Sequence, residues 1–173
     1  REVVWNVFDP EAETSESNRY LPHRDQTGAL TFVTMRLADS MPKSVVAAWQ
    51  AELQQWLKLN GLDGQTVDAI LQSTSVSNSL KRQLREYRDA RWHFHLDACH
   101  GECLLRDPRV ADEVKQSILH FNGVRYDVER FVIMPNHVHI LMQMRGEHAL
   151  RKILREMQRY SARQINFLLS RSG

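Results

Sequence analysis

The sequence lacks the features that mark several large classes of protein. Its 173 residues include only two cysteines, Cys99 and Cys103, which are too few for the disulfide framework of a small secreted domain and fit a reducing, cytoplasmic setting. No run of eighteen apolar residues occurs, so we expect no membrane-spanning helix. Residues 1–9 lack the long apolar core of a signal peptide. These absences leave a globular protein of one domain, or of one domain with an arm.

The sequence also lacks a large excess of charge of either sign, because its formal net charge is only +2. The charge is nevertheless unevenly distributed: residues 145–173 carry seven basic and two acidic side chains, whereas the rest of the chain sums to −3. A basic C-terminal segment on a slightly acidic body is typical of a protein that binds a polyanion, but a solvated face partly paired with Glu156 is the alternative. Four arginines recur at every fourth position, on one side of a helix: Arg151, Arg155, Arg159 and Arg163.

The pattern of apolar residues predicts an α+β fold. The expected strands are residues 30–37, 124–134 and 138–144. The expected helices begin at Ser40–Pro42, with Ser40 as the cap and Pro42 in the first turn, near Leu80, at Pro108 and near Glu147. Because strands and helices do not alternate one by one, we expect a mostly antiparallel sheet with helices packed on it. Residues 1–28 form an N-terminal arm and residues 29–173 the main domain, in which residues 41–97 are a helical insertion.

The most informative triplet in the chain is His137-Val138-His139. Alternation along a strand places both imidazoles on one face and Val138 on the other, in the core. Two neutral imidazoles on one face can converge on one metal ion and leave coordination positions open for a third ligand, water or substrate. A pair of surface histidines on a half-exposed strand is the alternative.

The context of these histidines resembles the signature of REP-associated tyrosine transposases, which belong to the His-hydrophobic-His single-tyrosine transposase superfamily. The resemblance covers about residues 28–173. The segments that carry it are Phe131–Leu141 (FVIMPNHVHIL), Thr31–Ser40 (TFVTMRLADS), Gly101–Ala111 (GECLLRDPRVA), Tyr160–Asn166 (YSARQIN) and Arg171–Gly173 (RSG).

The resemblance implies a fold, a cofactor and a substrate. The fold is a ferredoxin-like antiparallel sheet with helices on it, and the cofactor is Mg²⁺ or Mn²⁺ held by His137 and His139. The partner is single-stranded, hairpin-forming DNA, with which we expect the arginine row to make contact, and the chain is expected to be a monomer. The activity is endonucleolytic cleavage and strand transfer, in which a tyrosine attacks the scissile phosphate and the metal neutralises its charge.

The nucleophile is where the sequence departs from the family pattern. The family tyrosine is expected on a helix beyond Gly173, so the chain is expected to lack its C-terminal segment. Its own tyrosines are Tyr20, Tyr87, Tyr126 and Tyr160. Tyr160 is a candidate because Gln164 lies one turn later, but it falls almost in line with the apolar stripe of the last helix and is expected to face the core. The alternative function is therefore a non-catalytic nucleic-acid-binding protein that keeps the fold.

A second group of metal-ligand residue types lies within nine positions: His95, Cys99, His100 and Cys103. The Cys-x₃-Cys spacing is looser than that of the usual zinc-binding pairs. We expect a buried thiol and a helix end in this region rather than a zinc ion.

Overall fold

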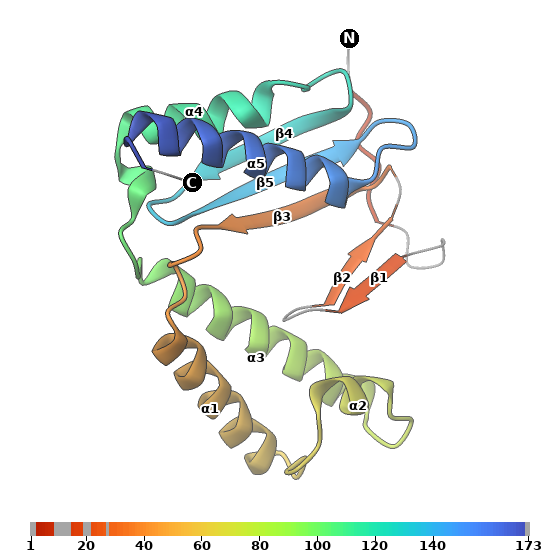
Figure 1. Cartoon of the computed structure of the whole chain (residues 1–173). Helices are drawn as coiled ribbons and strands as arrows, with labels where there is room; N and C mark the ends of the chain where they lie inside the picture. Colours follow the sequence, from red (N-terminus) through yellow and green to blue (C-terminus); the bar gives the residue numbers. More distant parts are fainter. Residues whose placement is uncertain (1–2, 9–14, 19–21, 27, 172–173) are drawn as a thin grey trace. The chain divides into compact units, whose positions relative to one another are not determined.

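The computed structural model describes residues 3–8, 15–18, 22–26 and 28–171. The chain divides into two compact units (Figure 1). The first, the sheet unit, comprises residues 1–36 and 104–173, and the second, the helical unit, comprises residues 37–103. In the sheet unit the elements are β1 (Ser15–Asn18), β2 (Pro22–Asp25), β3 (Leu30–Arg36), η1 (Leu104–Arg106), α4 (Pro108–Leu119), β4 (Tyr126–Ile133), β5 (His137–Met144) and α5 (Leu150–Leu168).

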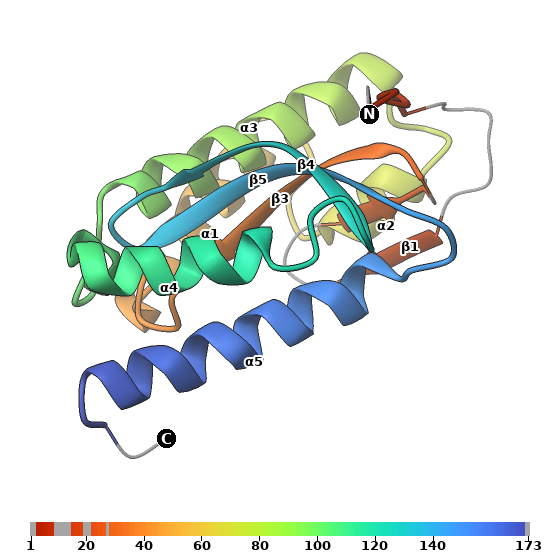
Figure 2. The same ribbon diagram turned by 90° about the horizontal axis from the view of Figure 1, so that it is seen from above.

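The main sheet has the order β3-β5-β4 and is antiparallel throughout. Helices α4 and α5 lie on one of its faces, as Figures 1 and 2 show from two directions. The chain turns from β4 to β5 through Pro135 and Asn136, and the turn is closed by the Met134 N–H, which donates to the His137 carbonyl at 2.8 Å. The expected α+β class with an antiparallel sheet is therefore confirmed.

The two faces of β5 differ because side chains alternate along a strand. Val138, Ile140 and Met142 are buried on one face. The same face carries Tyr126, which pairs with Met144 in the register of β4 and β5, and the Tyr126 hydroxyl donates to a carbonyl of α4 at 2.8 Å. Helices α4 and α5 therefore cover this apolar face, and His137 and His139 point to the opposite face.

The start of α4 follows from its local sequence. Asp107 caps the helix, because its side chain accepts the Arg109 backbone N–H at 2.9 Å, and Pro108 occupies the first turn, where no N–H is needed. Val110, Val114 and Ile118 recur at helical spacing and are buried. The expected helix start at Pro108 is confirmed.

The N-terminal arm contains structure that its sequence did not predict. β1 and β2 pair as an antiparallel two-stranded sheet. The Leu30 N–H donates to the Asn6 carbonyl at 2.6 Å, and the side-chain amide of Gln143 in β5 donates to the Val4 carbonyl at 3.2 Å. One backbone bond and one side-chain bond thus tie Val4 and Asn6 to the main sheet. Residues 1–2, 9–14, 19–21 and 27 of the arm lie outside the described residues.

The helical unit contains α1 (Lys43–Leu59), α2 (Val67–Gln72) and α3 (Asn78–Asp97). Its buried cluster is formed by Leu53, Leu57, Leu62, Ile70 and Leu84. Beside it, Glu52 of α1 accepts two hydrogen bonds from Arg91 of α3 at 2.7 and 2.8 Å. These bonds, together with one to His95, lower the pKa of Glu52 to about 2, despite an opposing effect of burial. Among the described residues, no helix is long and apolar enough to cross a membrane.

Candidate functional site

The two histidines of the triplet lie at the start of the central strand β5. His137 pairs with Arg36 at the end of β3, and His139 lies between Thr34 of β3 and Val132 of β4. His137 is fully buried. The prediction that both imidazoles share one face, with Val138 in the core, is confirmed.

The imidazole rings turn their Nε2 atoms toward each other. The two Nε2 atoms are 3.0 Å apart, and the rings are inclined at 76°. Each Nδ1 atom is held by a neighbour: that of His137 lies 2.8 Å from Oδ1 of Asn136, and that of His139 lies 2.9 Å from Oγ1 of Thr34. The Asn136 oxygen accepts the Nδ1 proton of His137, which leaves the lone pair of His137 on Nε2.

This arrangement fits a divalent metal ion. Imidazole nitrogens lie about 2.0–2.1 Å from a bound metal, so two ligands at right angles are separated by about 3 Å, which matches the separation of the Nε2 atoms. Ligating histidines usually make a second hydrogen bond through the other ring nitrogen, as both do here. Two nitrogen donors leave most of the coordination shell free for oxygen ligands, which is characteristic of catalytic rather than structural sites.

Sequence reasoning missed three residues around the histidines. Thr34 and Asn136 orient the rings, and Phe32 of β3 stacks on His139 with ring centroids 5.1 Å apart and 24° between the planes. Phe32 is 59% exposed, although it lies within a strand. An asparagine directly before the triplet was a visible signal. Thr34 and Phe32 become neighbours of His139 only through the pairing register of β3 and β5, which the sequence does not display.

Tyr160 does not lie where the sequence analysis expected it. Its side chain is 49% exposed, so the prediction that it faces the core is wrong. The side chain lies at the edge of the apolar stripe of α5, whose buried centre is formed by Ile153 and Met157. Because α5 covers the face of the sheet opposite to His137 and His139, the sheet separates the Tyr160 hydroxyl from the Nε2 atoms.

Tyr126, the other described tyrosine of the sheet unit, is also placed away from the histidine pair. Tyr126 is fully buried on the face that α4 and α5 cover, and burial raises the pKa of its hydroxyl. Tyr87 belongs to the helical unit, where its hydroxyl donates to the Glu52 carbonyl at 3.3 Å. Tyr20 lies outside the described residues. None of the tyrosines described in the sheet unit shares a face with the histidines.

The arginine row lies on the outer side of α5. All four side chains are exposed, on the side of the helix away from its buried residues: Arg151, Arg155, Arg159 and Arg163. Glu156 does not pair with them, contrary to the alternative considered above. Its carboxylate accepts instead from Arg125 at 2.9 Å. Within the part of the chain that the structure describes, the row makes no ion pair and presents four cations to solvent.

The cysteine and histidine residues of the helical unit do not form a metal site. Cys99 and Cys103 are not joined in a disulfide, and the Cys103 thiol donates to the Cys99 carbonyl at 3.0 Å. His95 bonds to Glu52 at 3.1 Å. Among the described residues, these four side chains do not gather as a group of metal ligands.

Comparison with protein families identifies one match. Residues 93–170 match the family described as "Transposase IS200 like". The matched segment includes α4, β4, β5 and α5, and therefore both His137 and His139. It supports a transposase-type function on DNA for this part of the chain. Comparisons with curated proteins and with solved structures gave no match.

Proposed function

We propose that this chain is a metal-dependent transposase domain that acts on single-stranded, hairpin-forming DNA of the REP type. His137 and His139 hold Mg²⁺ or Mn²⁺, and the activity is endonucleolytic cleavage followed by strand transfer. The observation that carries the proposal is the approach of the two Nε2 atoms to 3.0 Å, within the segment that matches IS200-like transposases.

The chain's own residues support this chemistry in separate ways. Thr34 and Asn136 fix the orientation of the imidazoles, so little conformational entropy is lost when they bind an ion. The exposed ring of Phe32 offers an apolar surface next to His139 on which a DNA base can stack. A bound divalent ion supplies positive charge that neutralises the scissile phosphate.

The arginine row serves a different part of the DNA. Its side chains point outward from α5, on the side of the sheet unit opposite to the histidine face. A hairpin is long enough to contact both surfaces, with one segment on the arginines and another at the histidines. The row thus contributes affinity through the phosphate backbone, while the histidine face provides the chemistry.

Hairpin-forming single strands are expected to bind more tightly than a blunt duplex of equal length. The physical reason is that a hairpin with single-stranded flanks exposes bases that can stack on aromatic side chains, whereas a duplex buries them. Fluorescence anisotropy at one fixed salt concentration, in the presence of Mn²⁺, measures both affinities. Tighter binding of the duplex would contradict the proposed substrate.

A non-catalytic role is favoured by one specific observation. Neither Tyr126 nor Tyr160 faces the histidine pair, and nucleophilic attack requires the hydroxyl in line with the phosphate at the metal. A chain that keeps the histidine face and the arginine row but supplies no tyrosine there would bind DNA without cutting it.

The 173-residue chain alone is therefore expected to form no covalent adduct with DNA. Incubation with Mn²⁺ and an end-labelled hairpin, followed by denaturing electrophoresis, detects a phosphotyrosine bond directly. An adduct that disappears in Tyr160→Phe would contradict the opposite-face geometry and make Tyr160 the nucleophile. An adduct that persists in Tyr160→Phe would assign the attack to Tyr20, Tyr87 or Tyr126.

A further inference from the structure

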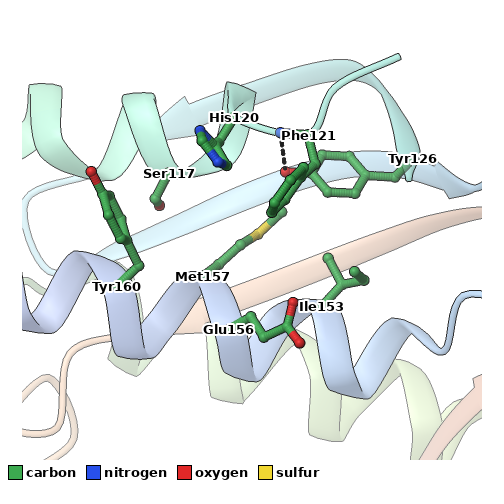
Figure 3. Close-up of a pocket in the computed structure, with 8 residues that line it drawn as sticks. All are labelled: Ser117, His120, Phe121, Tyr126, Ile153, Glu156, Met157 and Tyr160. Carbon is green, nitrogen blue, oxygen red and sulfur yellow. Dashed lines mark hydrogen bonds between the residues drawn. The ribbon is translucent and has the colours of Figure 1, made fainter. Parts of the chain in front are cut away.

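A pocket lies between α4 and α5, on the side of the sheet unit that does not carry the histidine pair (Figure 3). Its volume is about 150 Å³, and its walls are mainly apolar. The function proposed above does not use it. The lining residues are Ser117, His120, Phe121, Tyr126, Ile153, Glu156, Met157 and Tyr160.

Two of the lining side chains, His120 and Tyr160, have nearly parallel rings. The rings of His120 and Tyr160 are inclined by only 13°, and their centroids are 6.3 Å apart. Each ring that stacks on a planar group needs a separation of about 3.5 Å, so a planar ring between the two needs about 7 Å. The distance between the two centroids is short of this by less than 1 Å. Both side chains are exposed, so small rotations of their side-chain torsions can open the space.

The interior of the pocket suits an aromatic group. Ile153 and Met157 come from the buried stripe of α5, and the Phe121 ring comes from the end of α4. Figure 3 shows these side chains between the two helices, with Tyr160 extending from α5 toward α4 and Glu156 lying along α5. An apolar interior with few polar groups holds a flat heterocycle through its faces and leaves its edge to a specific contact.

Glu156 supplies such a contact. One of its carboxylate oxygens, Oε2, accepts from Arg125 at 2.9 Å. The other, Oε1, has no hydrogen bond within the described residues. An ionised carboxylate only accepts hydrogen bonds, so Oε1 favours a heterocycle whose edge presents N–H donors. Adenine, cytosine and guanine present an amino group with two such donors, whereas thymine presents only its N3–H, between two carbonyl oxygens that the carboxylate repels.

Positively charged side chains next to the pocket can bind the phosphate backbone of a nucleic acid. Arg163 lies three residues after Tyr160 on α5, where side chains are neighbours, and Arg159 directly precedes it. Both guanidinium groups are exposed. A base in the pocket would therefore have its phosphates beside the arginine row. Charge complementarity identifies a nucleotide strand, rather than an uncharged aromatic molecule, as the occupant.

We propose that this pocket holds one unstacked, amino-bearing base of the bound DNA strand, between the rings of Tyr160 and His120. The proposal rests on the function proposed above and adds a base-binding site that is separate from the histidine face. Tyr160 acts as a stacking surface, for which its hydroxyl is not needed. This role distinguishes it from a nucleophile.

The test uses the full chain and a hairpin-forming oligonucleotide in which 2-aminopurine, a fluorescent amino-bearing base, replaces each unpaired base in turn. Insertion between two rings changes the fluorescence of this base at one position. Tyr160→Leu is expected to weaken binding about tenfold, which is the typical effect of losing one stacked base, and to remove the fluorescence change. Tyr160→Phe is expected to bind within about twofold of the wild type.

Phe167→Leu is the matched control, because Phe167 is another exposed aromatic residue of α5, at 86% exposure, and does not line the pocket. It is expected to bind like the wild type. Circular dichroism of each variant confirms that the fold is retained. Deoxyadenosine monophosphate is titrated separately, to distinguish a base within a strand from a free nucleotide.

The outcomes separate the two proposals. If the wild type binds the hairpin and Tyr160→Leu binds it equally well, the base pocket is wrong and the DNA function stands. If the free nucleotide binds tightly and depends on Tyr160 while hairpin affinity does not, the strand is not the occupant. If the wild type binds no single-stranded DNA at all, the proposed function itself is wrong.

Discussion

Replacing His137 and His139 together with alanine is expected to abolish the binding of Mn²⁺ to this chain. The two Nε2 atoms, 3.0 Å apart, are the nitrogen donors of the candidate centre, and the variant removes both. Without them the ion would be left with water and weak oxygen ligands, so its affinity should fall by more than about a hundredfold. Isothermal titration calorimetry with Mn²⁺ on the wild type and the variant measures this loss.

Two further variants make the measurement specific. Thr34→Val removes the hydroxyl that holds Nδ1 of His139 while keeping the side-chain shape, and it is expected to weaken Mn²⁺ binding about tenfold. His120→Ala/His148→Ala removes two exposed histidines outside the pair and is expected to leave Mn²⁺ binding unchanged. Equal binding by the wild type and the His137→Ala/His139→Ala variant would show that the pair is not a metal site.

Removing the arginine row is expected to change the salt dependence of DNA binding. Each phosphate contact that is lost makes the slope of log K against log salt concentration less steep, by about 0.7 for a single strand. The triple variant Arg151→Ala/Arg155→Ala/Arg159→Ala should therefore flatten the slope by about 2 and weaken binding most strongly at low salt. All three side chains are exposed, so the substitutions should not disturb packing.

A charge-matched control distinguishes the row from a general effect of net charge. Lys58→Ala/Arg82→Ala/Arg85→Ala removes three exposed cations of the helical unit and is expected to leave the slope unchanged. Anisotropy titrations of a labelled hairpin from 50 to 300 mM salt give the slopes. An unchanged slope in the Arg151→Ala/Arg155→Ala/Arg159→Ala variant would mean that the row is a solvated face without a DNA contact.

Much of the sheet unit could be predicted because its signals are local. The alternation of Val138 and Ile140 with the histidines predicts which face of β5 carries the apolar core, and the structure confirms it. Asp107 and Pro108 mark the start of α4 through short-range capping and backbone geometry. In both cases the residues that determine the structure are neighbours in the sequence.

The parts that were missed depend on contacts between distant segments. Thr34 meets His139 only because β3 and β5 pair in one particular register. The exposure of Tyr160 depends on where α4 ends beside α5, and periodicity along α5 alone placed the side chain on the core side. Glu156 pairs with Arg125 rather than with the arginines of its own helix for the same reason. Helical periodicity indicates a face, but it does not indicate what packs at the edge of that face.

The most direct test of the central claim, that the histidine pair holds a metal which acts on bound DNA, is the effect of Mn²⁺ on hairpin affinity. Anisotropy is measured with and without Mn²⁺ at constant ionic strength, for the wild type and for His137→Ala/His139→Ala. Because coupling between two ligands is reciprocal, a metal that contacts the DNA phosphate must strengthen DNA binding. The wild type is expected to bind at least fivefold more tightly with Mn²⁺, which lies within the usual range of coupling between two sites, and the variant is expected to show no change. Equal strengthening in both proteins, or in neither, would contradict the claim.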